Sequence, residues 1–364
     1  MAQTRRRFLG ALAAAGGALL GGCAGTAPAQ RGIRGYDVRA IDLHAHWHAP
    51  EFVELLARKG NGKGARIGRN EKGLVTLSAP GINSVFQPRY MDLESRIREM
   101  NQIGVDIHVL SLTSPMVYWA TPDFGLELAE AYNTAASTAH LRYPERFYGA
   151  ITLPMQSPNL ALQELDRASD LPGMRAVYLA EHVNGRNLDD KSFWPIYERC
   201  QTLRLPIFLH PVDPVGADRM RSYYLRNFIG NPTDSAIAAA SLMFGGVLDA
   251  YPDLDVLLPH SGGTFPWLIG RMTHGAAVRP ETKHMTKPAI SYLRRFHYDT
   301  VQHNAEIMLD VIRLVGVDRV AMGSDFPADM DVERPVDFVE SLTALSVRDK
   351  EMILGRNGAR LLRI

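Results

Sequence analysis

The chain has 364 residues, of which 46% are hydrophobic and 22% are charged, and this is the composition of an ordinary globular protein. It excludes wholesale disorder, a coiled coil and a protein with many membrane spans. The 40 basic and 39 acidic residues leave a formal net charge of +1, so no basic surplus indicates a nucleic-acid partner.

The first 30 residues predict an export signal. Arg5, Arg6 and Arg7 form a twin-arginine pattern, and the 15 residues from 8 to 22 then contain no charge. Fifteen residues span only about 22 Å as a helix, which is less than the ~30 Å core of a bilayer. A removable signal therefore fits better than an anchor helix, and we expect export by the twin-arginine route to the periplasm.

Two cleavage sites compete at the end of this signal. Leu20-Gly21-Gly22-Cys23 resembles a lipoprotein box, in which Cys23 would be acylated and would anchor the protein to a membrane. Ala27-Pro28-Ala29 instead resembles the small-x-small site of ordinary signal peptidase. The chain has only two cysteines, too few for a disulfide framework or a cysteine-based zinc site. Because one of them ends the apolar run, the pattern favours the lipoprotein.

From Val38 onward, short apolar runs alternate with longer helical patterns. The strand candidates are 40–46, 106–112, 148–153, 176–180, 205–210, 255–260, 296–299 and 319–324. The helical patterns between them include 93–103, 126–143, 160–168, 193–203, 237–251 and 305–315. Eight strands that alternate with helices predict one α/β domain over residues 38–364, a (β/α)8 TIM-like barrel whose parallel sheet is covered by helices.

One insertion interrupts this alternation after the first strand–helix unit. Residues 60–88 are rich in Gly and Asn and contain the apolar run Leu74-Val75-Thr76-Leu77. This composition predicts a small β flap.

Metal-ligating residues follow several of the predicted strands. His44 and His46 end the first strand, and period-2 alternation places both side chains on one face, at the carboxyl-terminal mouth of the barrel. His210 and His260 end two later strands, and Asp325 follows the last. Because all these ends converge on one mouth, the pattern predicts a metal site there. Three histidines and a carboxylate, with one position left open, are typical of a catalytic metal.

The predicted fourth barrel strand bears on how many metals this site holds. Binuclear barrels of this kind usually bridge their metals with a lysine at that strand's end, and residues 176–181 contain none. We therefore expect one metal, with Glu181 as the residue that would bridge a second.

At this point the chain resembles the amidohydrolase superfamily, and within it the branch of aminocarboxymuconate-semialdehyde decarboxylase and the resorcylate-type decarboxylases. The resemblance runs from about residue 40 to residue 362. The segments that carry it are Asp42-Leu43-His44-Ala45-His46, Ser95-Arg96-Ile97-Arg98-Glu99-Met100, Phe208-Leu209-His210-Pro211, His260-Ser261-Gly262-Gly263-Thr264-Phe265-Pro266, Gly270-Arg271-Met272, Gly323-Ser324-Asp325-Phe326-Pro327 and Asn357-Gly358-Ala359-Arg360-Leu361-Leu362.

The resemblance implies a role for each matching residue. His44, His46, His210 and Asp325 match the family's metal ligands, usually for zinc and in some members for manganese. His260 matches the family's acid/base histidine.

Arg279 matches an arginine that, in the aminocarboxymuconate enzyme, reaches into the neighbouring subunit's site and holds a substrate carboxylate. This correspondence implies a homodimer with shared sites. The second carboxylate-binding arginine of that enzyme has Gln87 at the closest register, with Arg89 as a replacement nearby. This departure argues against aminocarboxymuconate semialdehyde itself as the substrate. His182 is a further candidate for substrate contact because it follows Glu181 at a strand end.

The chemistry leaves three functions open. The first is a metal-dependent, non-oxidative decarboxylase of an aromatic or dienoic carboxylic acid, in which His260 or Asp325 moves the proton. The alternative is a metal-dependent hydrolase of a lactone, amide or ester, which would use the same parts. A non-catalytic binding protein is disfavoured by the intact ligand set.

Overall fold

The computed structural model describes residues 35–364, and the predicted export signal and Cys23 lie outside this range. Within it, no helix is both long enough and apolar enough to cross a membrane.

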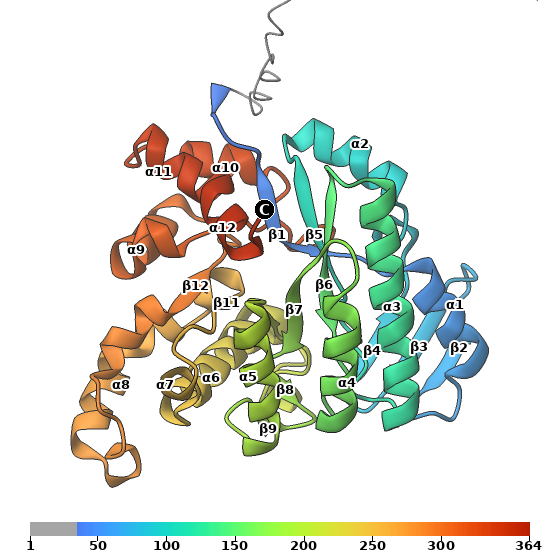
Figure 1. Cartoon of the computed structure of the whole chain (residues 1–364), viewed down its shortest axis with the longest axis horizontal. Helices are drawn as coiled ribbons and strands as arrows, with labels where there is room; N and C mark the ends of the chain where they lie inside the picture. Colours follow the sequence, from blue (N-terminus) through green and yellow to red (C-terminus); the bar gives the residue numbers. More distant parts are fainter. Residues whose placement is uncertain (1–34) are drawn as a thin grey trace, which may run out of the picture. The chain divides into compact units, whose positions relative to one another are not determined.

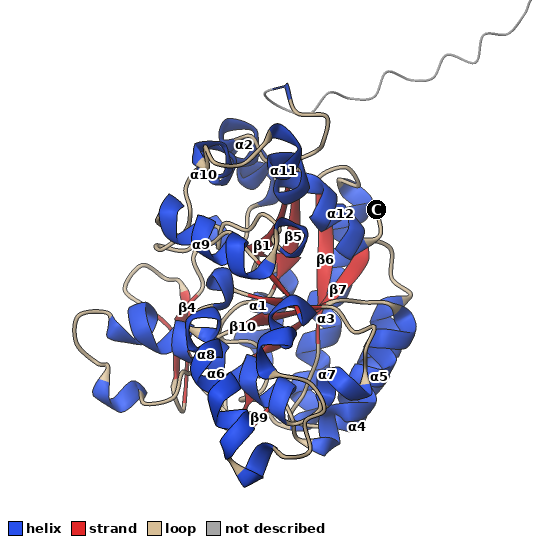
Figure 2. Ribbon diagram, turned by 90° about the vertical axis from the view of Figure 1, so that its left-hand side faces the viewer, coloured by secondary structure: helices blue, strands red, loops and turns tan. Residues whose placement is uncertain are grey.

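A sheet of seven parallel strands, in the order β1-β5-β6-β7-β10-β11-β12, forms the centre of the fold (Figure 1). The strands are β1 (Ile41–His46), β5 (Ile107–Ser111), β6 (Phe147–Thr152), β7 (Met174–Ala180), β10 (Ile207–His210), β11 (Val256–Leu258) and β12 (Phe296–Tyr298). Figure 2 shows these strands in the interior with helices around them, as expected for strands that are apolar on both faces.

The prediction of an eighth strand over residues 319–324 is wrong in detail. In the described chain, this segment is not a regular strand. It still closes the barrel, through single parallel bridges from Val320 to Tyr298 and from Phe326 to Ala45. Some of its backbone groups have partners outside the neighbouring strands, since the amide of Met322 donates to the carbonyl of Ile353 at 2.9 Å. The sheet is therefore curled into the predicted TIM-like barrel, but its last member is held by mixed contacts.

Helices cover the outside of this barrel. The longer ones are α1 (Pro50–Lys59), α2 (Leu93–Ile103), α3 (Pro122–Arg142), α4 (Pro158–Ser169), α5 (Trp194–Leu203), α6 (Asn231–Phe244), α8 (Phe265–Val278) and α9 (Ala305–Val315). The shorter ones are α7 (Val247–Ala250), α10 (Pro335–Ser341), α11 (Val347–Glu351) and α12 (Asn357–Leu362).

Local signals explain where these helices begin and end. The helix α2 has its predicted bounds because the side chain of Asp92 caps its first turn, accepting from the amides of Glu94 and Ser95, and Gly104 ends it with φ +80°. The predicted helix 237–251 is wrong as a single helix. It breaks between α6 and α7 because Gly246 adopts φ +81°, a conformation that glycine allows.

The predicted β flap is confirmed as a three-stranded antiparallel sheet. Its strands are β2 (Arg66–Arg69), β3 (Val75–Ala79) and β4 (Ile82–Val85). A two-stranded hairpin, β8 (His182–Val183) and β9 (Arg186–Asn187), follows β7. The flap tip is tied to the barrel by Arg226, whose Nη2 donates to the carbonyl of Gly81 at 2.9 Å and to that of Val212, after β10, at 3.1 Å.

Candidate metal centre

Four side chains meet at the carboxyl-terminal mouth of the barrel. His44 and His46 come from β1, His210 ends β10, and Asp325 lies on the segment that closes the barrel. All four are buried, and one potential ligand atom from each lies within 4.8 Å of the others. The fold thus brings together the four residues that the family resemblance assigned to the metal.

The histidine Nδ1 atoms in this cluster are already engaged. His44 Nδ1 lies 2.7 Å from Asp299 Oδ2, and His210 Nδ1 lies 2.8 Å from the carbonyl of its neighbour, Pro211. His46 Nδ1 lies 3.1 Å from the hydroxyl of Ser111. The Nδ1 proton that these acceptors favour leaves the Nε2 lone pair free to bind a cation.

The Nε2 atoms converge on one carboxylate oxygen, Oδ1 of Asp325. It lies 2.7 Å from His46 Nε2, 3.3 Å from His44 Nε2 and 3.9 Å from His210 Nε2. Within the described chain, the buried Nε2 atoms of His44 and His210 make no hydrogen bond. Three convergent imidazole nitrogens, two of them without a partner, and one carboxylate fit a divalent metal.

The protonation states favour the same interpretation. Burial lowers the pKa of His210 to about 4 and that of His46 well below its usual range, so both are neutral, as ligands must be. Burial alone would raise the pKa of Asp325, but the charge of His44 and the nearby imidazoles of His210 and His260 hold it well below its usual range. Burial alone would lower the pKa of His44, and the carboxylates of Asp325 and Asp299 instead raise it to about 10. A metal cation would therefore displace a proton from His44 when it binds.

Asp299 organises this cluster from behind, and the sequence analysis did not single it out. Its fully buried carboxylate accepts from His44 Nδ1 at 2.7 Å. It also accepts from the backbone amides of His260 at 3.1 Å, Ser261 at 2.8 Å and Val301 at 3.0 Å. Its position in the sequence could have indicated this role. Asp299 directly follows β12 and so lies at a strand end, as His210 does at the end of β10.

His260, the predicted acid/base residue, lies beside the metal ligands. Its Nε2 is 3.6 Å from Asp325 Oδ2, and its buried Nδ1 makes no hydrogen bond to the described residues. His260 and Asp325 adopt φ +52° and +68°, a region that is costly for residues other than glycine. The hydrogen bonds that the backbone amides of His260 and Ser261 donate to Asp299 hold the turn at His260 in this strained conformation.

A second buried network, centred on Arg96, lies behind His46. It gives a structural role to the segment 95–100, which the sequence analysis used only as part of the family resemblance. Arg96 is fully buried and donates to the carbonyl of His46, while its Nη1 lies 3.2 Å from His108 Nδ1. Its guanidinium lies 4.8 Å from the centre of the Phe326 ring. Arg96 thus ties α2 to both ends of the metal cluster, at β1 and just after Asp325.

The predicted substrate contacts each have partners outside the four-residue metal cluster. Arg89 pairs with Glu99 at 3.0 Å and lies 5.0 Å from the centre of the Phe326 ring. Arg279, just after α8, is exposed and pairs with Glu281 at 2.6 Å. His182, on β8, donates from Nε2 to the carbonyl of Asp213, in the loop after β10, at 2.8 Å. The metal cluster found in the described chain does not include Glu181.

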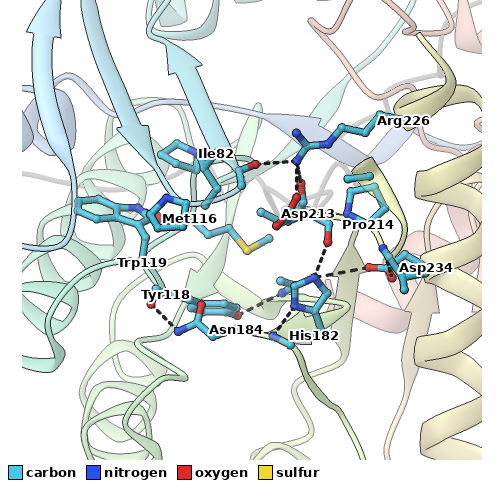
Figure 3. A pocket seen from close by; sticks show the side chains of 18 of the residues that line it. Ile82, Met116, Tyr118, Trp119, His182, Asn184, Asp213, Pro214, Arg226 and Asp234 are labelled. Atoms are coloured by element: carbon cyan, nitrogen blue, oxygen red, sulfur yellow. Dashed lines mark hydrogen bonds and ion pairs between the residues drawn. The ribbon is translucent and has the colours of Figure 1, made fainter. Parts of the chain in front are cut away.

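Two cavities open at the mouth. One, of about 370 Å³, is lined by His260 and Asp325 together with Phe228 and Trp267. The other, of about 1600 Å³, lies beneath the flap tip and is lined by His182 (Figure 3). The smaller cavity is the one that reaches the candidate acid/base histidine.

Comparison with known families agrees with this geometry. Residues 41–364, nearly the whole described chain, match the sequence profile of the family described as Amidohydrolase. The chain belongs to the amidohydrolase family. This membership confirms the resemblance inferred from the sequence, and the barrel is the fold expected of an amidohydrolase.

Two relatives of this amidohydrolase align along most of their length. A 2-amino-3-carboxymuconate-6-semialdehyde decarboxylase from Dictyostelium discoideum is 34% identical over 326 residues, which cover 88% of this chain and 91% of the relative. A gamma-resorcylate decarboxylase from a Polaromonas species is 30% identical over 300 residues, which cover 77% and 90%.

Solved structures show the same fold. The Metarhizium anisopliae IDCase has a TM-score of 0.78 at 23% identity, with 89% of this chain and 97% of that chain covered. A dihydroxybenzoic acid decarboxylase from Polaromonas, solved with manganese and 2-nitroresorcinol, has a TM-score of 0.73 at 24% identity, with 90% and 97% covered.

We predict that Asp299→Asn weakens metal binding by about 10- to 100-fold, because an amide in place of the carboxylate no longer fixes the His44 tautomer. The measurement is the metal retained per chain during titration with a chelator. Asp310→Asn, which changes a carboxylate on α9 outside the cluster, is the control. Equal retention in the Asp299 variant and the wild type would contradict this role.

Proposed function

We propose that this amidohydrolase is a metal-dependent, non-oxidative decarboxylase of an aromatic or dienoic carboxylic acid. The observation that carries the proposal is the cluster of His44, His46, His210 and Asp325 beside His260, in a chain that aligns over most of its length with decarboxylases. The names of these relatives favour the lyase over the hydrolase. Zinc suits three imidazoles and a carboxylate, and manganese is the alternative.

The reaction needs an electron sink and a proton. The bond between the ring or diene carbon and the carboxylate breaks, CO2 leaves, and the bonding electrons stay on carbon, which then takes a proton. When bound, a divalent cation supplies a Lewis acid that polarises a substrate oxygen.

His260 is placed to move the proton. His260 lines the smaller cavity and its Nε2 lies 3.6 Å from Asp325 Oδ2, so its imidazole can move a proton beside the metal cluster. We assign delivery to carbon to His260, because Oδ1 of Asp325 is committed to the histidine cluster.

Two variants test this proposal. We expect about one metal per chain in the wild type, its loss in His44→Ala, and its retention in His260→Asn. We also expect His260→Asn to lower CO2 release by about 10²- to 10⁴-fold. Metal content is measured on purified protein, and CO2 release is measured with 2,6-dihydroxybenzoate, 5-carboxyvanillate and a panel of dienoic acids.

Other results would overturn it. Hydrolysis of lactones or esters without CO2 release from any acid would replace the lyase by the hydrolase. If the wild type bound no metal, even after reconstitution, the metal-dependent mechanism would be excluded.

We also propose that two copies of the chain pair at the face around the smaller cavity. Phe228 and Trp267 line that cavity and are 52% and 49% exposed, and the neighbouring Ile229 and Leu268 are exposed as well. An apolar patch of this kind is typical of an interface. The helix α8 would then bring an arginine to the partner's site, as the resemblance implies for Arg279.

We expect Trp267→Glu to give a monomer in sedimentation analysis and Arg279→Gln to raise KM for the acid at least tenfold. Arg271→Gln tests the second candidate arginine of this helix. Arg271 is exposed one turn after Trp267 on the same side of α8. A wild type that sediments as a monomer would contradict the pairing. If neither arginine variant changed KM, the region of α8 would contribute no substrate-binding arginine.

We propose, finally, that residues 1–30 direct export by the twin-arginine route, with Cys23 as a lipid anchor. Fractionation of cells that express the whole chain tests this proposal, and we expect Arg5→Lys together with Arg6→Lys to retain the protein in the cytoplasm. In Cys23→Ala we expect the protein to move from the membrane fraction to the periplasm. Export that does not depend on the arginine pair would contradict the signal.

A further inference from the structure

The larger cavity beneath the flap is not used by the reaction proposed above. At about 1600 Å³ it exceeds the usual 300–1000 Å³ of a small-molecule site. Figure 3 shows its lining: Ile82 from the flap, Met116 and Trp119 from the loop after β5, and the polar pair His182 and Asp234 opposite them. A single benzoate ring at the metal would leave this space unfilled.

The cavity extends to the level of the metal ligands. Ala180, the last residue of β7, lines it and is the register partner of His210 on β10. In-register residues of neighbouring parallel strands point to the same side and lie about 4.8 Å apart. Two residues earlier on that side, the Tyr178 hydroxyl lies 3.4 Å from His46 Nδ1, so this face of β7 points toward the metal cluster.

Asp234 gives the cavity an unused hydrogen-bond acceptor. It lies on the first turns of α6, is 4% exposed, and its Oδ2 makes no hydrogen bond to the described residues. The nearest histidine nitrogen, Nε2 of His182, is 3.8 Å away.

The ring of His182 is already committed to backbone groups. Its Nε2 donates to the carbonyl of Asp213 at 2.8 Å, and its Nδ1 accepts from the amide of Gly185 at 3.2 Å. Both ring nitrogens of His182 are thus engaged by backbone groups, and neither is left to donate to Asp234.

The arginines of the cavity are committed too. Arg226 binds the carbonyls of Gly81 and Val212, and its Nη2 also lies 2.9 Å from Asp213 Oδ1. Arg221 pairs with Asp218 at 2.6 Å. With these cations engaged and only Oδ1 of Asp234 bonded, by the Val215 amide at 3.4 Å, the free Oδ2 favours a group that donates hydrogen bonds over a second carboxylate.

We infer that the substrate is an extended acid, an inference that rests on the decarboxylase proposed above. Its carboxylate-bearing ring lies at the metal cluster. An apolar body continues past Ala180 beneath the flap, beside Met116 and Trp119. A hydroxyl or amino group at the far end donates to Asp234.

The test compares three acids on the metal-loaded full chain: 2,6-dihydroxybenzoate, its 4-phenyl derivative and its 4-(3-hydroxyphenyl) derivative. Affinity is measured by calorimetry, and CO2 release is followed in parallel. We expect the hydroxyphenyl acid to bind at least tenfold more tightly than the phenyl acid, because a hydrogen bond to a buried carboxylate is strong.

Variants then assign this gain to one residue. We expect the difference between the two extended acids to disappear in Asp234→Leu and to shrink in Asp234→Asn. Leucine removes a buried carboxylate whose one hydrogen bond, from the Val215 amide to Oδ1, is long at 3.4 Å, so this variant is expected to keep its fold. Asp218→Asn, a change at an exposed carboxylate on the cavity rim, should preserve the difference.

The outcomes separate this inference from the decarboxylase. A hydroxyphenyl acid that binds no more tightly than the phenyl acid, or a gain that survives in Asp234→Leu, overturns the inference. So does CO2 release from 2,6-dihydroxybenzoate when neither extended acid binds, and that result leaves the decarboxylase standing. A gain that depends on Asp234, without CO2 release from these three acids or from the earlier panel, supports the cavity assignment and removes the decarboxylase.

Discussion

The buried carboxylate of Asp299 is the constraint on which the metal centre depends. Burial alone would raise its pKa, but the hydrogen bond and charge of His44, the neighbouring His260 and the Ser261 amide together outweigh burial and lower it, so the group stays charged inside the barrel. That charge faces His44 on one side and the strained turn at His260 on the other. Ligand orientation and the position of the acid/base histidine therefore follow from a single side chain.

Much of this arrangement follows from sequence periodicity. The side chains of His44 and His46 share a face because strand residues alternate, and a closed barrel brings the ends of distant strands to one mouth. The bounds of α2 and α9 could be predicted because residues such as Asp92 and Gly104 mark them chemically. Local rules thus located the elements, and barrel geometry located the ligands.

What could not be predicted depends on contacts between distant segments. Asp299 reads in sequence as one more acidic residue after a strand, and its role appears only when the strand ends meet. Arg96 lies on a helix of polar composition, and only the packing of α2 against β1 makes it a buried cation. The segment 319–324 has strand-like composition, but the carboxylate of Asp42 accepts a hydrogen bond from the Ser324 amide at 3.1 Å. This bond stands in place of a backbone hydrogen bond between strands.

The closing segment also sets when the centre can form. His46 and Asp325 are separated by 279 residues in the chain, and the backbone of the Asp325 segment is held partly by residues near Ile353. During synthesis the first ligands leave the ribosome long before the last, and contacts across such a separation form slowly. The metal centre is thus among the last features to assemble, and its completion reports that nearly the whole barrel has been made.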